Sequence, residues 1–253
     1  MLRQMNSFDG KRLLALVRGG DYAHAGEEEA IEQAFRDVPK RGDLSILDVG
    51  CGRGGTADFL RRSGWGGTIA GIDRERDSIE YARAHYPEIQ FEACDVLDVP
   101  RVLTRRFDLI YMLNAFYAFD AQRDALAAVR KVAAAGARLV IFDYLDRGGF
   151  AANPLVLNDS SIVPHAIDMS RTPEDLAAAG WKLESAEELN DEYRRWYADL
   201  VNRIERKRDE IIALGGDNAF AYMMSVYGGM LEKIERGLLG GVLLNASASP
   251  HPL

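Results

Sequence analysis

The sequence predicts an α/β fold with a doubly wound, mostly parallel sheet of seven strands. Short apolar segments alternate with segments of helical periodicity, and this alternation is typical of a parallel sheet with helices on both faces. The apolar segments lack alternating polar residues, as expected of strands that are buried on both sides. A glycine-rich turn at residues 50–55 follows the first of them, and such turns hold ligands at the carboxyl ends of parallel strands.

The elements follow in order along the chain. We expect strands at 45–49, 68–72, 89–93, 107–112, 137–143, 181–187 and 240–246, and helices at 8–18, 27–38, 55–63, 75–84, 121–133 and from Thr172 to near Gly180. Between the last two strands come two long helical patterns, 190–213 and 217–237, which we interpret as a helical cover inserted over the ligand edge of the sheet. Residues 146–170 are expected to form a long loop, and the tail from Ser247 to Leu253 is expected to be loose.

The composition limits the partners. The chain has 253 residues and a formal net charge of -8, which disfavours nucleic acids and membranes because their phosphates are held mainly by Lys and Arg. The two cysteines, Cys51 and Cys94, both lie inside predicted ligand motifs, so we expect packed free thiols and no metal site. Free thiols, and the lack of a signal-peptide-like or long apolar run, predict a cytoplasmic location. We expect a monomer or a homodimer.

An acid beside the glycine turn decides which ligand the turn can hold. Gly50, Gly52 and Gly55 satisfy the G-x-G-x-x-G pattern of dinucleotide sites, where a pyrophosphate rests on a helix N-terminus. Asp48, two residues before Gly50, would repel that phosphate. A carboxylate suits instead a ligand with no phosphate and a cationic amino group. S-adenosylmethionine has this pattern of charge.

Two further acids end the second and third strands. Asp73 lies about 20 residues after the glycines, the position that meets ribose hydroxyls in βαβ nucleotide sites. Asp95 follows the third strand, where a carboxylate can accept a hydrogen bond from an adenine amino group. The glycine turn, Asp73 and Asp95 therefore predict a nucleoside site at the carboxyl ends of the strands.

Over about residues 40–145 these motifs resemble those of the class I S-adenosylmethionine-dependent methyltransferases. The matching segments are Leu47 to Gly54 (the first motif), Gly71 to Asp73 (ribose), Cys94 to Val96 (adenine) and Phe107 to Tyr111 (the fourth strand). The resemblance implies the Rossmann-like methyltransferase fold, S-adenosylmethionine as cofactor and methyl transfer near Asn114 to Tyr117. It implies cofactor contacts from Asp48, Gly50, Cys51, Gly52, Gly54, Asp73, Arg74, Asp95, Val96 and Asn114.

The same resemblance suggests how the chain is divided. Residues 1–40 correspond to an N-terminal helical lid segment, since family members commonly close the cofactor site with such a segment. Residues 41–145 form the cofactor-binding core. Residues 146–253 supply the substrate-side loop, the helical cover and the final strand.

Candidate catalytic residues are harder to predict. The methyl donor is already activated, so the protein mainly aligns the reactants and excludes water. His24 and Tyr22 lie in the loop before the first strand, and His is the side chain most easily poised near neutral pH. Tyr117 follows the fourth strand, and His165 lies in the loop after the fifth, where it could be the base for a hydroxyl acceptor. Each also has a plainer interpretation, as a loop histidine or a packing tyrosine.

Aromatic residues on the cover favour an amine acceptor. Tyr193, Trp196 and Tyr197 have i, i+3 and i+4 spacing, and aromatic faces attract ammonium groups, although such spacing is more typical of a core. Arg194 and Arg195 beside them could clamp a carboxylate. Residues 191–245 also resemble, less specifically, the C-terminal part of small-amine methyltransferases of the sarcosine and dimethylglycine type.

The sequence therefore predicts a methyltransferase acting on a small molecule, with N-methylation of an amine as the first interpretation. Two alternatives stay open: an O- or C-methyltransferase of secondary metabolism with a His base, and a cofactor-binding regulator without activity. The segment Asn114-Ala115-Phe116-Tyr117 lacks the Asn/Asp-Pro-Pro-Tyr/Phe motif of nucleic-acid methyltransferases, which disfavours a nucleic-acid substrate.

Overall fold

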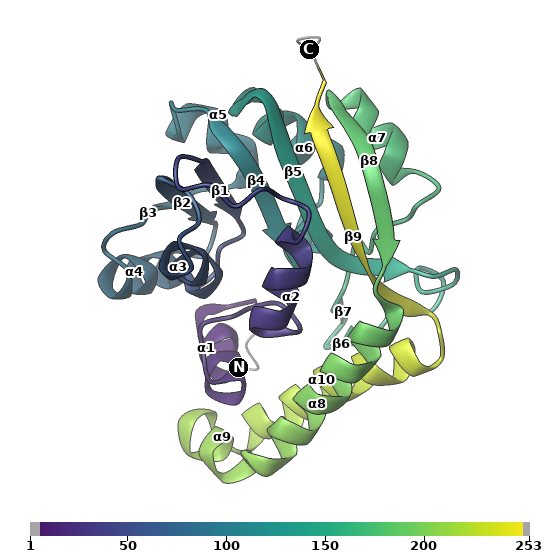
Figure 1. The fold of residues 1–253 in the computed structure, drawn as a ribbon. Coiled ribbons are helices and arrows are strands. Elements are labelled where there is room, and N and C mark those ends of the chain that lie inside the picture. The colour runs from purple at the N-terminus through teal and green to yellow at the C-terminus, as the bar shows by residue number, and fades with distance from the viewer. Residues whose placement is uncertain (1–5, 250–253) are drawn as a thin grey trace.

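A seven-stranded sheet organises the molecule. The structure is a computed structural model, and it describes residues 6–249. The strand order is β3-β2-β1-β4-β5-β9-β8, with helices on both faces (Figure 1). Strands β1 to β5 pair in parallel, and β9 pairs antiparallel with both β5 and β8. The predicted α/β fold, with helices inserted between the last two strands of the chain, is confirmed.

The element bounds are close to those expected. The sheet strands are β1 Ser45–Val49, β2 Thr68–Asp73, β3 Gln90–Ala93, β4 Phe107–Leu113, β5 Ala133–Asp146, β8 Trp181–Glu188 and β9 Leu239–Ala248. The α-helices are α1 Phe8–Arg18, α2 Glu27–Phe35, α3 Gly55–Arg62, α4 Arg76–His85, α5 Val99–Val102, α6 Gln122–Lys131, α7 Thr172–Ala178, α8 Asn190–Arg206, α9 Arg208–Gly215 and α10 Asp217–Glu235. Two 3-10 turns, η1 Val96–Asp98 and η2 Phe116–Ala118, follow β3 and β4.

Four details differ from the prediction. β5 begins at Ala133, four residues before the expected start. Its register with β4 shifts between Phe107 and Leu109, and Gly136 has a φ of 71°, so the strand contains a bulge near its beginning. The first cover helix is split at Lys207 into α8 and α9. The loop 146–170 contains a small hairpin, β6 Val156–Leu157 and β7 Ser160–Ser161. The tail is not loose at Ser247, which belongs to β9; residues 250–253 lie outside the described residues.

The core consists of two apolar clusters, one on each face of the sheet. Neighbouring strand residues alternate between them: Ile46 belongs to one and Leu47 to the other, and Tyr111 and Ile110 divide in the same way. All four side chains are buried. This burial on both sides is the physical reason why the strands are apolar throughout, and it leaves the carboxyl ends of the strands as the edge open to a ligand.

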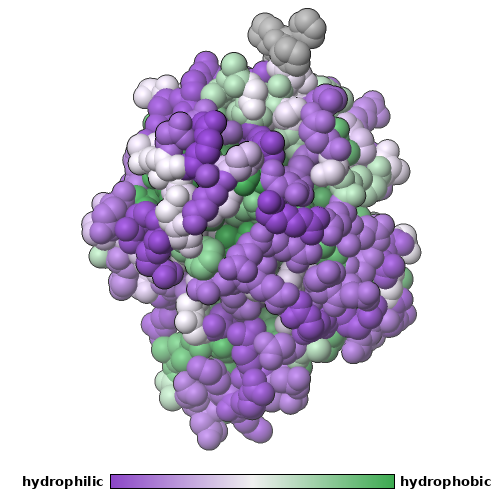
Figure 2. Space-filling model, in the orientation of Figure 1, coloured by the Kyte–Doolittle hydropathy of each residue, from purple (hydrophilic) through white to green (hydrophobic). Residues whose placement is uncertain are grey.

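The N-terminal helices lie between the sheet and the helical cover (Figure 1). Lys207 donates to the Leu16 carbonyl oxygen at 3.0 Å and Arg203 pairs with Glu27 at 3.1 Å, so the cover holds this segment in place. The face of the molecule in Figure 2 is largely hydrophilic, with smaller apolar areas, in keeping with the acidic composition. Within residues 6–249 no helix is long and apolar enough to cross a membrane.

Candidate active site

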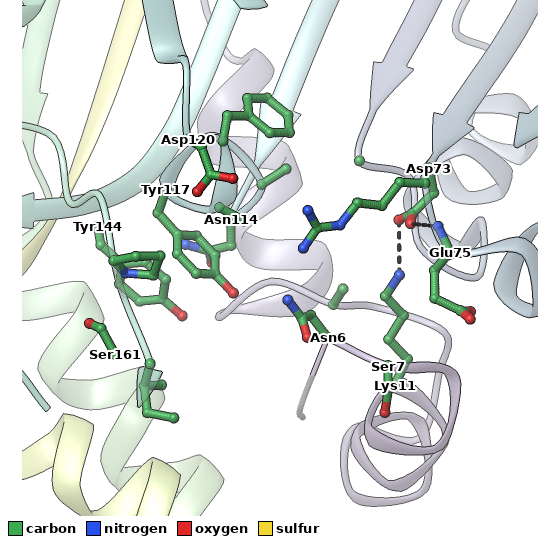
Figure 3. Close-up of a pocket in the computed structure, with 18 of the residues that line it drawn as sticks. Asn6, Ser7, Lys11, Asp73, Glu75, Asn114, Tyr117, Asp120, Tyr144 and Ser161 are labelled. Atoms are coloured by element: carbon green, nitrogen blue, oxygen red, sulfur yellow. Dashed lines mark hydrogen bonds and ion pairs between the residues drawn. The ribbon is translucent and has the colours of Figure 1, made fainter. Parts of the chain in front are cut away.

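One cavity of about 740 Å³ lies against the carboxyl ends of the strands. Figure 3 shows its two ends, with Asp73, Lys11 and Glu75 on one side and Asn114, Tyr117 and Tyr144 on the other. The first end is lined by the predicted cofactor residues Gly50, Asp73, Arg74, Asp95 and Val96, and the predicted Asn114 lines the cavity beside Tyr117. The second end, which we call the acceptor end, is lined by Arg18, Tyr117, Asp120, Tyr144, Leu157, Ser161, Ile162, Tyr222, Val226, Tyr227 and Met230.

The glycine turn is held against β2 by backbone hydrogen bonds. The Gly50 and Cys51 N–H groups both donate to the Ile72 carbonyl oxygen, at 2.8 and 2.9 Å. Gly50 has a φ of 81°, and a Cβ placed on it would lie 2.4 Å from the Cβ of Ala115. Only glycine meets both requirements, so the backbone comes close to the cavity here without a side chain in the way.

Asp73 ends β2 with its carboxylate fully engaged. Oδ2 accepts from Gly52 N–H at 2.8 Å and from Lys11 Nζ at 2.9 Å, and Oδ1 accepts from Glu75 N–H at 2.8 Å (Figure 3). The two backbone bonds fix the carboxylate in orientation at the cavity wall. Lys11, which comes from α1, is the partner that a ribose diol would have to replace or share.

Asp48 lies on the inner side of the turn, outside the lining of the cavity. Its side chain is buried, and Oδ2 has no hydrogen-bond partner among the described residues. Burial raises the pKa of this carboxyl group to about 8; the Tyr111 hydroxyl opposes the shift and Asp73 adds to it. A buried carboxyl group without a partner is the arrangement expected where a bound cation completes the site.

The adenine end is formed by the segment after β3. Asp95 Oδ1 accepts from Leu97 N–H at 2.9 Å and so caps the short η1 turn, while Cys94, Val96 and Leu97 line the cavity. Arg74, the residue after β2, lines the cavity, and its charge partly opposes the rise that burial causes in the pKa of Tyr117. Cys51, by contrast, is buried away from the lining, as are Gly52 and Gly54. They shape the turn without facing the cavity.

Asn114 joins three parts of the chain at the middle of the cavity. It has a φ of 48° directly after β4. Its Oδ1 accepts from Ala25 N–H at 3.1 Å, and its Nδ2 donates to the Tyr193 hydroxyl at 3.0 Å. Polar Asn tolerates this left-handed conformation better than most residues. The side chain thereby connects the N-terminal segment, the core and the cover around the site.

These features fit the expected cofactor. The close backbone approach at Gly50 and the oriented Asp73 carboxylate, both of which line the cavity, match a methionine end and a ribose respectively. When bound, S-adenosylmethionine supplies an activated methyl group on a sulfonium.

The acceptor end is built from tyrosines of different elements. Tyr117 and Tyr144 meet edge to face with ring centroids 5.0 Å apart, and Tyr144 shares a hydrogen bond with the Tyr197 hydroxyl. Burial raises the pKa of Tyr117, Tyr144 and Tyr227 above the usual range. Their hydroxyls therefore stay neutral at physiological pH and present aromatic faces and hydrogen-bonding groups rather than charge.

The structure does not bring His24 and Tyr22 to the cavity. His24 Nε2 lies 3.0 Å from Thr56 Oγ1 and Nδ1 lies 3.2 Å from the Ala25 carbonyl oxygen, so both ring nitrogens are bonded. Burial lowers the pKa of His24 to about 3, with Arg18 contributing. The Tyr22 hydroxyl donates to Glu28 at 2.9 Å. The expected catalytic role of these two residues is not supported, because their polar atoms tie the N-terminal segment together.

His165 lies at the rim. Its Nε2 is 3.3 Å from Oδ1 of Asp120, which lines the cavity, although His165 itself does not. The two cover arginines lie further away: Arg194 pairs with Asp191 and Arg195 with Glu29, both on the surface. The predicted carboxylate clamp is not formed by this pair.

Several residues of the cavity were not expected from the sequence. Ser7, Lys11, Leu14 and Arg18 all line it from one face of α1. Their i, i+4, i+7 and i+11 spacing is the signal that could have indicated a cavity-facing stripe. Buried Asp143 was also missed; it accepts from the N–H groups of Tyr144 and Tyr117 at 2.8 and 3.1 Å and so holds the two tyrosines in place.

The fold and this site define a class I S-adenosylmethionine-dependent methyltransferase. The family model described as "Methyltransferase domain" matches residues 40–197, and the chain belongs to this family. The expected cofactor is the one this class uses.

Individual relatives agree with the class. The chain is 26% identical to the O-methyltransferase cnsE of Penicillium expansum over 176 residues, which are 67% of this chain and 63% of that protein. It superposes on the cyclopropane synthase MmaA2 of Mycobacterium tuberculosis with a TM-score of 0.79 at 16% identity, covering 96% of both chains. A putative sarcosine dimethylglycine methyltransferase of Galdieria sulphuraria gives 0.76 at 17% identity, covering 96% of this chain and 98% of the other. At these identities the two structures show the shared fold alone.

Proposed function

We propose that this protein transfers the methyl group of S-adenosylmethionine to the nitrogen of a small amine. The observation that carries the proposal is a continuous cavity, which joins the Asp73 and Asp95 edge to an end lined by tyrosines. Donor and acceptor can therefore meet within one cavity, where the protein aligns them.

The chemistry of the acceptor end supports an amine. Methyl transfer to a neutral amine needs alignment more than it needs a base, whereas a hydroxyl acceptor usually needs a base within hydrogen-bond reach. No histidine is among the cavity-lining residues within 6–249. The faces of Tyr117, Tyr144, Tyr222 and Tyr227 suit the positive charge that builds on the nitrogen during transfer.

One observation favours a second candidate, O-methylation. Asp120 lines the cavity and lies 3.3 Å from His165, so a proton could leave the cavity through this pair. The relative from Penicillium expansum is named an O-methyltransferase. For a hydroxyl acceptor, His165 would act as base through Asp120 or after a change of rotamer.

Labelled S-adenosylmethionine separates these candidates. The purified protein is incubated with glycine, sarcosine, dimethylglycine and catechol in separate reactions, with Asp73→Ala as the matched control. Label on an amine supports the proposal, label on catechol alone selects O-methylation, and cofactor binding without transfer to any of the three amines counts against the amine proposal. We expect Asp73→Ala to weaken cofactor binding by at least about tenfold, since it removes a charged hydrogen-bond acceptor.

A further inference from the structure

A strap of chain runs along α10 at the acceptor end of the cavity (Figure 1). It consists of residues 153–165 and contains the β6–β7 hairpin. At its start, Lys233 of α10 donates to the backbone carbonyl oxygen and to Oδ1 of Asn153, both at 2.9 Å. Two residues further on, the Leu155 side chain packs so closely on Gly229 that a Cβ there would lie 2.8 Å from it. Strap residues two apart therefore meet α10 about one turn apart.

This spacing creates an apolar slot between the strap and α10. Two extended residues advance about 6.6 Å and one helical turn about 5.4 Å, so the two elements stay nearly in step and Leu157 comes near Val226. On the returning strand, the Ile162 N–H donates to the Leu155 carbonyl oxygen at 2.9 Å. We define the slot by the four apolar side chains that line the cavity here, which are Leu157, Ile162, Val226 and Met230.

The far end of the strap is also anchored. The His165 N–H donates to the Tyr117 carbonyl oxygen at 3.2 Å, and Gln122 Nε2 donates to the His165 carbonyl oxygen at 2.9 Å. The strap is thus bonded to α10 at its start and to the segment after β4 at its end. The slot is therefore part of the folded protein, and its apolar walls are in place for a ligand.

The charged groups at the acceptor end already have partners in the protein. Arg18 is buried, pairs with Glu27 at 3.4 Å and donates to carbonyl oxygens of the loop after α1. Asp120 lies 3.3 Å from His165 at the rim. A second charge on the acceptor would compete with these contacts, whereas an apolar body gains free energy by leaving water. Arg74, which lines the cofactor end, is the cation that a carboxylate on the acceptor would use instead.

We propose that the acceptor carries an apolar alkyl or aryl body, which lies in the slot between the strap and α10 while its reacting atom faces the cofactor end. The slot is continuous with the cavity that the Asp73 edge lines, so a single molecule can reach both. This inference rests on the methyl transfer of the proposed function, and it applies to a nitrogen or an oxygen acceptor alike.

Binding of amines to the complex with S-adenosylhomocysteine, the product form of the cofactor, tests the inference without turnover. Ethylamine, butylamine and hexylamine are titrated by ligand-detected NMR, with sarcosine as the carboxylate-bearing comparison. Each buried CH₂ group should tighten binding about fourfold, so hexylamine should bind on the order of a hundredfold more tightly than ethylamine. Sarcosine should bind no more tightly than ethylamine.

Leu157→Ser tests whether the slot is where the apolar body binds. Leu157 is partly buried on the strap, and its loss should weaken hexylamine binding by about tenfold while the affinities for ethylamine and S-adenosylhomocysteine stay unchanged. Val156→Ser is the matched control. Val156 precedes Leu157 in β6, is 51% exposed and is not among the cavity-lining residues within 6–249. This variant should keep all the wild-type affinities.

Three results would overturn the inference: an affinity that does not rise from ethylamine to hexylamine, sarcosine binding more tightly than hexylamine, or equal losses in the two variants. The wild-type series decides the matter if Leu157→Ser does not fold. A wild type that does not bind S-adenosylhomocysteine would overturn the proposed function and the inference together. Transfer of label to catechol alone, with affinity rising along the series, would overturn the amine proposal and leave the apolar body standing.

Discussion

The two ends of the cavity are built in different ways. The cofactor end is made of consecutive strand ends and a glycine turn, and its contacts include backbone groups such as Gly52 N–H and Glu75 N–H. The acceptor end is made of side chains that converge from α1, β5, the β6–β7 hairpin and α10. A backbone-built end is fixed by the fold, whereas an end built from side chains can change its chemistry by single substitutions. The comparison explains how one fold serves many acceptors.

The largest effect is expected from a change in the backbone-built end. In Gly50→Ala the new Cβ would lie 2.4 Å from Ala115, at a φ of 81°. The overlap costs about 1–3 kcal/mol and the left-handed strain about 1–2 kcal/mol. The turn must therefore shift, and cofactor affinity should fall by on the order of a hundredfold. Calorimetry with S-adenosylhomocysteine measures the loss.

Gly136→Ala is the matched control for strain alone. Gly136 has a φ of 71°, but a Cβ there has nothing within 4 Å. It should lose about 1–2 kcal/mol of unfolding free energy and keep the wild-type affinity. Equal affinity losses in the two variants would show that the close approach at Gly50 is unimportant.

The next effect concerns the side chains of the acceptor end. Tyr144→Phe removes the hydroxyl of a cavity-lining tyrosine, which bonds to the Tyr197 hydroxyl. We expect KM for the acceptor to rise by up to about tenfold, as for the loss of one hydrogen bond, with cofactor affinity unchanged. Steady-state kinetics with an acceptor found in the panel checks this. A parallel loss of cofactor affinity would contradict the separation of the two ends.

The protonation of His24 should make the stability of the folded protein depend on pH. Its pKa is about 3 in the folded protein against an ordinary value of 6.5, so the stability that it contributes is present above pH 6.5 and is lost as the pH falls toward 3. His24→Asn should flatten the decline of the unfolding free energy below pH 6.5, as measured by urea denaturation. A pH–rate profile of methyl transfer that changed its midpoint in this variant would restore His24 as a base.

The smallest effect is expected on the surface of the cover. Arg195 forms a solvent-exposed ion pair with Glu29, and such ion pairs contribute about 0–1 kcal/mol to the free energy of unfolding. Arg195→Gln should therefore change neither the melting temperature by more than a few degrees nor KM for any acceptor. A large increase in KM for a carboxylate-bearing acceptor would show that this arginine reaches the substrate after all.

The sequence allowed the cofactor end to be predicted because its signals are local. Asp48, Asp73 and Asp95 lie within two residues of the carboxyl ends of β1, β2 and β3, and parallel strands bring these ends together. The acceptor end depends on contacts between distant segments. The local sequence around His24 could not indicate its partner Thr56, which lies 32 residues further on. Lys11 and Ser161 reach the cavity only through the packing of α1 and of a two-residue strand pair that the loop composition did not indicate.

The contact between Lys11 and Asp73 has a consequence for the speed of cofactor exchange. Since Lys11 already holds the carboxylate that the ribose needs, cofactor entry has to displace the Lys11 side chain or share the carboxylate with it. Cofactor exchange then includes the opening and closing of one ion pair between α1 and β2, a step that Lys11→Ala would remove.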